Sequence, residues 1–250
     1  QRHLTIPCEM CIRDRGYTTQ KFKSHYASIS VRNFADDRIN DFDAATIINP
    51  TGTDEDIQEW SMTSYLSRLN YNYKDKYMLS ASIRRDGSSR FGEDNLWGNF
   101  PSVSAGWLVS EENFFPKDRL ISNMKVRASY GLTGNNNIGN YTHNALVNLG
   151  ENAVFNNSVE SGSAVSNISN RNLGWEKTKQ IDLGVDVSIL KNRINLAYDY
   201  YSKQTNDLLY NFSIAPSSGY TNFIGNSGEL KFWGHEFSVD AKILTGALKW

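Results

Sequence analysis

Gln-Ile-Asp-Leu-Gly-Val-Asp-Val-Ser-Ile, residues 180–189, alternates strictly between polar or small residues and apolar residues. Successive side chains of a β-strand point to opposite faces, so this segment predicts a strand with one apolar and one polar face. The same alternation appears in the segments that begin at Tyr77, Met124, Ile194 and Phe237. The sequence therefore predicts an all-β protein built from many such strands.

The connections between the expected strands differ in length in a regular way. Strands are expected at 21–33, 61–73, 77–85, 99–110, 121–130, 174–190, 193–204 and 234–244, and a ninth begins at Ala247. Long loops, expected at 34–60, 86–98, 131–173 and 205–233, alternate with shorter connections, of which 111–120 includes an expected helical turn at 111–115. Because antiparallel strands place alternate connections at opposite ends, all long loops fall at one end. Outer-membrane barrels have short periplasmic turns and long extracellular loops. The expected fold class is therefore part of a transmembrane antiparallel β-barrel.

Aromatic residues gather where the expected strands end, which is typical of the aromatic girdles at the two surfaces of a membrane barrel. Tryptophans mark the long-loop end and tyrosines mark the short-turn end. The residues expected in the two girdles are Trp60, Trp97, Trp175, Trp233, Tyr71, Tyr73 and Tyr77.

Charged residues in the middle of the expected strands share the polar phase. They are Arg127, Asp182, Asp186 and Asp240. Each would cost about 2–4 kcal/mol or less if it faced lipid at the bilayer centre, depending on residue type and depth. We therefore expect all four side chains to face the lumen.

The composition excludes several other functions. The chain has 26 Lys and Arg against 27 Asp and Glu, so it lacks the basic excess that nucleic-acid binding requires. Its histidines, His3, His25, His143 and His235, are far apart and have no catalytic spacing. The acidic run 54–56 lacks the order of a calcium loop. We expect no enzymatic activity, no cofactor and no metal.

Residues 1–15 differ in character from the remainder. They contain the only cysteines, Cys8 and Cys11, which form half of a possible metal site without a second pair. The stretch 7–15 resembles translated sequencing-adapter read-through. Residues 1–15 are therefore expected to be non-native, and residues 16–250 to form the barrel part.

Several stretches from about residue 56 onward resemble one family. They are Tyr-Lys-Asp-Lys-Tyr-Met-Leu-Ser-Ala-Ser-Ile-Arg-Arg-Asp-Gly-Ser-Ser-Arg-Phe-Gly at 73–92, Trp-Gly-Asn-Phe-Pro-Ser at 97–102, Lys-Val-Arg-Ala-Ser-Tyr-Gly-Leu-Thr-Gly-Asn at 125–135, Leu-Gly-Trp-Glu-Lys-Thr at 173–178 and Asp-Tyr-Tyr at 199–201. These stretches resemble the barrel of SusC-like, TonB-dependent outer-membrane transporters.

The resemblance implies a 22-stranded barrel with an N-terminal plug, of which this chain would hold eight or nine strands and no plug. It implies import of oligosaccharides or peptides across the outer membrane of a Gram-negative cell. The implied partners are a SusD-like surface lipoprotein, the TonB–ExbB–ExbD complex acting through the plug, and outer-membrane lipid. An alternative is a small self-contained structural or adhesive barrel, which would require strand 21–33 to pair with strand 234–244.

Aromatic and basic residues on or beside the long loops are the candidates for binding a nutrient, because flat rings can stack on sugars or peptide side chains around a few polar groups. Arg85 and Asp86 lie beside several of these candidates, where the loop expected at 86–98 begins. The candidate substrate-binding residues are Phe91, Trp97, Phe155, Tyr220, Phe223, Arg84 and Arg90.

Overall fold

The computed structural model describes residues 10–36, 38–39, 41–116, 120–149 and 151–243. Within these ranges, no helix has the length and apolar character that crossing a membrane requires. The ninth strand, expected from Ala247, lies outside the described residues. The described residues contain four short 3-10 turns: η1 (Phe42–Ala44), η2 (Glu93–Asn95), η3 (Val109–Glu111) and η4 (Pro216–Ser218). η3 ends at Glu111, where the helical turn at 111–115 was expected to begin, and within that span a hydrogen bond from the Phe115 N–H to the Glu112 carbonyl oxygen at 3.2 Å closes a single turn.

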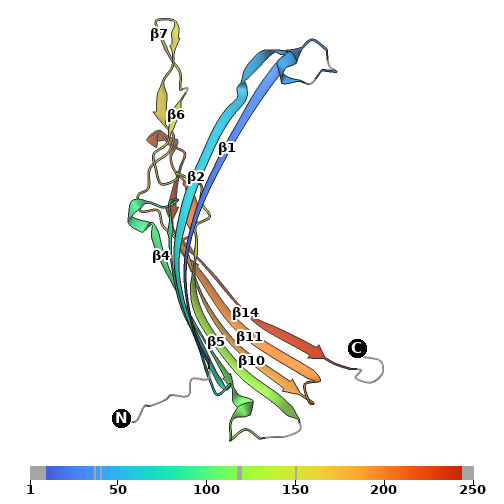
Figure 1. Ribbon diagram of the computed structural model, residues 1–250. Helices are drawn as coiled ribbons and strands as arrows, with labels where there is room; N and C mark the ends of the chain where they lie inside the picture. The colour runs from blue at the N-terminus through green and yellow to red at the C-terminus, as the bar shows by residue number, and fades with distance from the viewer. Residues whose placement is uncertain (1–9, 37, 40, 117–119, 150, 244–250) are drawn as a thin grey trace.

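Eight long strands form one sheet, which curves through space as an open wall (Figure 1). They are β1 (Met10–Phe34), β2 (Ala45–Tyr73), β3 (Tyr77–Ser88), β4 (Trp97–Leu108), β5 (Ile121–Asn135), β10 (Glu176–Ile189), β11 (Ile194–Asn206) and β14 (Glu229–Ala241). The spatial order is β1-β2-β3-β4-β5-β10-β11-β14, and every neighbouring pair is antiparallel. The all-β prediction is confirmed.

The pairing register carries the sequence alternation across the whole wall. Val185 of β10 lies opposite Val126 of β5 and Tyr198 of β11, whereas the next residue, Asp186, lies opposite Lys125 and Ala197. Because side chains of opposed residues point to the same side, each row of the sheet is either apolar or polar. We call the side that carries Val185 the apolar face and the side that carries Asp186 the polar face.

The first hairpin is much longer than the sequence pattern predicts. Pairing of β1 with β2 continues to Phe34 opposite Ala45, with one irregularity between Ser28 and Ser30. The expected loop at 34–60 is therefore wrong over most of its length, and the acidic run 54–56 lies within β2. Backbone hydrogen bonding extends this hairpin beyond the segments with apolar alternation, so a pattern based on side chains ends too early.

The short connections are tight turns at one end of the sheet. Lys74 and Asp75 adopt positive φ angles of 52° and 53° between β2 and β3, and such paired left-handed residues match the right-handed twist of a hairpin. Leu190, Lys191 and Asn192 adopt 53°, 58° and 62° between β10 and β11, where the Arg193 N–H donates to the Ile189 carbonyl oxygen at 3.1 Å. The prediction of short turns at these two places is confirmed.

The long connections lie at the other end and contain small hairpins. Between β5 and β10, β6 (Val147–Leu149) pairs with β9 (Ser163–Val165), and β7 (Ala153–Phe155) pairs with β8 (Ser158–Glu160). Between β11 and β14, β12 (Leu209–Ser213) pairs with β13 (Asn222–Asn226). β6 and β7 project at the same end of the molecule as the tip of the β1–β2 hairpin (Figure 1).

The wall has two free edges in the part of the chain that the structure describes. β1 is paired on one side with β2, β14 is paired on one side with β11, and no described residue of β1 pairs with β14. The closure that a self-contained eight-stranded barrel requires is therefore not seen. The open sheet is the arrangement expected for part of a larger barrel.

Candidate functional site

Large hydrophobic side chains are exposed along the whole apolar face. Leu79 of β3 is 45% exposed, Val103 of β4 is 43% exposed and Leu183 of β10 is 49% exposed. Leu79 and Ala105 are opposed across β3 and β4, and Leu183 and Ala128 across β10 and β5, so these residues belong to one continuous surface. A contiguous apolar surface of this extent requires an apolar environment.

An aromatic ladder borders the apolar face at the short-turn end. Tyr71 stacks on Tyr73 with ring centroids 6.4 Å apart, Tyr73 stacks on Tyr77 at 6.3 Å, and Tyr77 stacks on Trp107 at 6.4 Å. The structure thus brings together the three predicted tyrosines. Trp107 was missed because its place at the end of an expected strand, opposite Tyr77, depends on a register that the sequence alone does not give.

Two of the four predicted tryptophans lie on the apolar face at the long-loop end. The Trp97 ring stacks on Tyr65 at 6.0 Å, and the Arg85 guanidinium lies 5.1 Å from the Trp97 ring centroid. Trp233 of β14 is 63% exposed. Since Trp97 lies opposite Gly87 in the apolar rows of the sheet, its prediction as a substrate-binding residue is corrected.

The other two tryptophans are not on the apolar face. Trp60 lies opposite Phe22 and shares the phase of Ser64, which places it on the polar side, where its ring stacks on Phe22 at 5.9 Å. Trp175 is only 5% exposed, and its indole N–H donates to the Leu96 carbonyl oxygen at 3.1 Å. Their assignment to the girdle is corrected, because Trp60 lies inside β2 on its polar side and Trp175 lies buried directly before β10.

A buried cluster joins the bases of the long loops. Phe91, Phe100, Leu173 and Trp175 form it, and the Trp175 ring lies 4.9 Å from the Phe91 ring centroid and 5.3 Å from that of Phe100. Phe91 is 0% exposed. Its prediction as a substrate-binding residue is corrected, because no ligand reaches a fully covered ring. We name these four residues the loop-end cluster.

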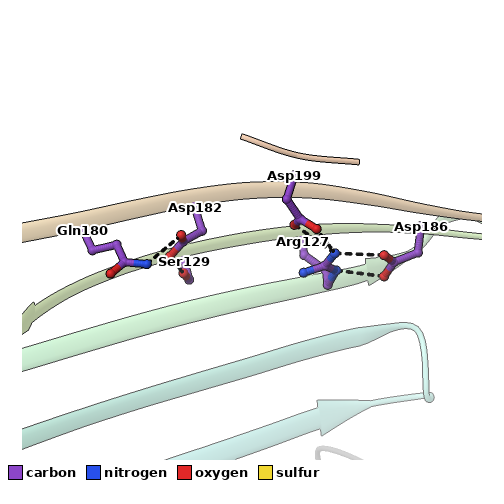
Figure 2. Close-up of polar contacts among 6 residues, drawn as sticks. All are labelled: Arg127, Ser129, Gln180, Asp182, Asp186 and Asp199. Atoms are coloured by element: carbon purple, nitrogen blue, oxygen red, sulfur yellow. Dashed lines mark hydrogen bonds and ion pairs between the residues drawn. The ribbon is translucent and has the colours of Figure 1, made fainter. Parts of the chain in front are cut away.

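The polar face carries a charged network at the middle of the wall (Figure 2). Arg127 donates from Nε and Nη2 to the two carboxylate oxygens of Asp186, both at 2.8 Å, and from Nη2 to Asp199 at 3.1 Å. Register explains this grouping, since Arg127 lies opposite Gly184, and Gly184 lies opposite Asp199. The glycine leaves room for the ion pair, because an added Cβ there would lie 2.8 Å from the guanidinium carbon of Arg127 and 2.3 Å from an Asp199 oxygen.

The remaining predicted acids of the polar face also have partners. Asp182 accepts hydrogen bonds from the Ser129 hydroxyl at 2.8 Å and from the Gln180 amide at 2.9 Å (Figure 2). Asp240 accepts from the Asn195 amide at 3.3 Å. The four predicted residues thus share one face, and Asp199 joins them. Asp199 has the polar phase of the alternating segment that begins at Ile194, but it was not among the predicted residues, because its nearness to Arg127 depends on the pairing register.

The two predicted arginines near the loop entrance are held by the protein itself. Arg84 donates from Nε to both Asp86 oxygens at 2.7 and 2.8 Å, and Asp86 is 5% exposed. Arg90 donates to the Asn140 side-chain oxygen at 2.9 Å, and its guanidinium lies 4.8 Å from the Trp60 ring centroid. Both side chains thus have partners within the protein, and the Arg84 side chain is still 49% exposed.

The last three candidate ligand residues lie on two different loops. Phe155 is 65% exposed in β7, near the tip of its hairpin. Phe223 of β13 is half-buried and its ring lies 6.4 Å from that of Phe212, while Tyr220 is half-buried between η4 and β13. Tyr220 and Phe223 are close in the chain, and within the described part of the chain neither of them forms a ring contact or a hydrogen bond with Phe155. Among the described residues, no group of three His, Cys, Asp or Glu side chains could hold a metal ion.

Comparison with known proteins gives consistent matches over nearly the whole chain. The family model described as "TonB dependent receptor-like, beta-barrel" matches residues 14–250. TonB-dependent receptor P39 of Formosa agariphila is 42% identical over 227 residues, which cover 91% of this chain and 22% of that protein. TonB-dependent receptor SusC of Bacteroides thetaiotaomicron is 38% identical over 197 residues, which cover 76% of this chain and 19% of that protein.

Among solved structures, the RagAB peptide transporter aligns with a TM-score of 0.83 and 27% sequence identity, covering 94% of this chain and 26% of that one. The chain therefore spans only about a quarter or less of these relatives. The proteins it matches are receptors and transporters rather than enzymes. The open wall, its two chemically distinct faces and the matched family lead to one conclusion: this chain belongs to the TonB dependent receptor-like β-barrel family of the outer membrane.

Proposed function

We propose that this chain is part of a SusC/RagA-type transporter that imports a nutrient, an oligosaccharide or a peptide, across the outer membrane. The observation that carries the proposal is the two-faced wall. Its apolar face suits contact with lipid, and its polar face, with Arg127 held by Asp186 and Asp199, suits a water-filled or plugged lumen. Membership of the TonB dependent receptor-like β-barrel family also supports a role in transport.

One solved structure similar to this chain is described as a peptide transporter, which supports the peptide class. The oligosaccharide class rests on the resemblance to SusC-like transporters, and one curated relative is named SusC. We propose that the whole protein works with a SusD-like surface lipoprotein and that TonB–ExbB–ExbD supplies energy through a plug. Phe155, Tyr220 and Phe223 remain the proposed aromatic contacts for the nutrient, since they lie in the long loops and their rings are not sealed in the loop-end cluster.

Uptake by cells that express the full-length protein tests the function. We expect accumulation of a labelled peptide mixture or a labelled oligosaccharide mixture, and we expect that accumulation to disappear when TonB is deleted. Uptake of neither class, or uptake that is unchanged without TonB, would contradict the proposal. Replacing Phe155 by Ala should lower uptake at limiting nutrient without changing the amount of protein in the outer membrane.

We also propose that residues 1–15 do not belong to the native barrel. The register of β1 places Arg13 opposite Leu69 and Arg15 opposite Ser67, so both arginines lie in rows of the apolar face. Arginine facing lipid costs about 2–4 kcal/mol at the bilayer centre. Sequencing the genomic region across this segment tests the proposal. An uninterrupted genomic reading frame that encodes residues 1–15 would contradict it.

A further inference from the structure

The apolar face changes to a cationic surface within two residues at the long-loop end. In β10, Lys177 and Lys179 precede Ile181 in the rows of that face, and in β14, Lys231 precedes Trp233. One step of two residues along a strand corresponds to about 7 Å. On β10 and β14 the lysines therefore lie directly beyond the last apolar residue of each strand, while Leu132 of β5, opposite Lys179, continues the apolar face. We take this end of β10 and β14 as the level where a bilayer meets water.

The register places two of these lysines side by side. Lys179 of β10 and Lys231 of β14 both lie opposite Gln204 of β11. Two strand spacings separate them, which is about 10 Å. In the next row toward the short turns, Ile181 and Trp233 both lie opposite Ser202. The cationic row is thus continuous with the lipid-compatible surface and parallel to it.

The charges of this row have no acidic partner among the described residues. Lys177, Lys179 and Lys231 are exposed, and none of them forms one of the ion pairs in the described part of the chain. Glu229 shares the face of Lys231 and lies one row further toward the long loops, and it accepts a hydrogen bond from the Gln204 amide at 3.0 Å. By contrast, the arginine at the middle of the polar face holds two carboxylates.

We propose that Lys179 and Lys231, with Lys177 beside them, bind the phosphate groups of lipids in the outer leaflet of the outer membrane. A long lysine side chain can lie along the apolar surface and place its ammonium group at the level of the headgroups. Each lysine near an anionic membrane surface contributes about 1 kcal/mol of attraction. Arg85 beside Trp97 places a further cation at the same rim, on β3. This proposal rests on membership of the outer-membrane family and not on which nutrient is imported.

The test uses the full-length protein that contains this chain, purified in detergent, and lipid A that carries both phosphates as the probe. We expect lipid A to bind, and we expect the double variant K179Q/K231Q to bind it about 30-fold more weakly, the product of two contributions of about 1 kcal/mol. The matched control, K125Q/K203Q, removes two lysines of the polar face, opposite Asp186 and Gln180. We expect the control to bind like the unchanged protein, and K179R/K231R to keep most of the affinity.

Three results would overturn the proposal. The first is equal affinity of K179Q/K231Q and K125Q/K203Q. The second is equally tight binding of dephosphorylated lipid A, which would assign the affinity to the acyl chains. The third is that inorganic phosphate protects the protein against thermal unfolding as well as lipid A does at the same phosphate concentration. That result would mean that the lysines bind a free anion. Heat-modifiable migration of both double variants on electrophoresis verifies that each protein is folded.

Discussion

The wall of the sheet and the loop-end cluster are built by different rules. In the wall, each side chain takes its environment from its phase in the strand, so Val185 and Asp186 are neighbours in the chain with opposite surroundings. In the loop-end cluster, Phe91 comes from the loop after β3, Phe100 from the long-loop end of β4, and Leu173 and Trp175 from the segment before β10. Local alternation therefore determines contact with lipid or lumen, while long-range packing determines which loop residues are available to a ligand.

The strongest way to break the wall is to place a charge on its apolar face. Val185→Arg should prevent assembly of the full-length protein into the outer membrane, because arginine at the bilayer centre costs about 2–4 kcal/mol. The matched control is Ala197→Arg, on the polar face opposite Asp186. Heat-modifiable protein in the outer-membrane fraction is the measurement. Equal amounts of the two variants would mean that the faces are assigned wrongly.

The structure also shows why Ala197 and not Asp186 is the suitable control. Asp186 accepts two hydrogen bonds from Arg127, so Asp186→Arg would place two guanidinium groups together and leave Arg127 with Asp199 alone. From the sequence alone, Asp186→Arg is expected to be tolerated. The ion pair makes that expectation unsafe, because charge reversal at one partner converts an attraction into a repulsion.

Shortening a side chain of the loop-end cluster should make the long loops more mobile without unfolding the sheet. Phe91→Ala removes a fully buried ring, and such substitutions typically cost about 3–5 kcal/mol. We expect faster protease cleavage within 136–175 and 207–228 while the heat-modifiable barrel persists. Phe155→Ala, at a ring that is 65% exposed, is the control and should leave the cleavage rate unchanged. Identical cleavage of both variants would show that Phe91 does not hold the loops.

A smaller effect is expected from the charged network of the polar face. Arg127→Lys keeps the charge but loses the two parallel hydrogen bonds to Asp186, because a lysine ammonium cannot reproduce the planar fork. Arg127 is partly exposed, so solvent screening limits the loss to about 1 kcal/mol. The denaturant midpoint of the full-length protein in lipid is the measurement, with Lys203→Arg as a control that should show no change. A midpoint unaffected by Arg127→Lys would mean that the network is only a surface contact.

The smallest effect concerns the loop between β1 and β2. Arg38 donates from its side chain and its backbone N–H to Asp36 and thereby lowers the pKa of that carboxyl to about 2. A lowered pKa stabilises the paired form above the ordinary pKa, and the contribution is lost as the pH falls toward 2. Carboxyl NMR titration of labelled aspartate should show this midpoint and its return toward the ordinary value in Arg38→Ala. An ordinary midpoint in the unchanged protein would refute the contact.

Much of the wall could be predicted from the sequence, because a period of two residues is a local property. The polar placement of Arg127, Asp182, Asp186 and Asp240 follows from phase alone, and the register agrees with it. The strand ends could not be predicted as well, because β1 and β2 pair far beyond the apolar alternation.

Trp60 and Trp175 show where local reasoning fails at the candidate site. Trp175 lies directly before β10, as expected, but it is sealed by residues from other segments, whereas Trp60 lies well inside β2 and has the polar phase. Asp199 and Trp107 became recognisable only through their cross-strand neighbours, Gly184 and Tyr77. Such residues require the pairing register, which depends on the whole sheet.

Accessibility of single spin labels along β10 tests the two-faced wall most directly. A label placed in turn at each position from 181 to 188 of the full-length protein in a bilayer would be probed with oxygen, which concentrates in lipid, and with a polar nickel complex. The account predicts high oxygen accessibility at 181, 183, 185 and 187 and low oxygen accessibility at 182, 184, 186 and 188. A profile without a period of two, or with the opposite phase, would contradict it.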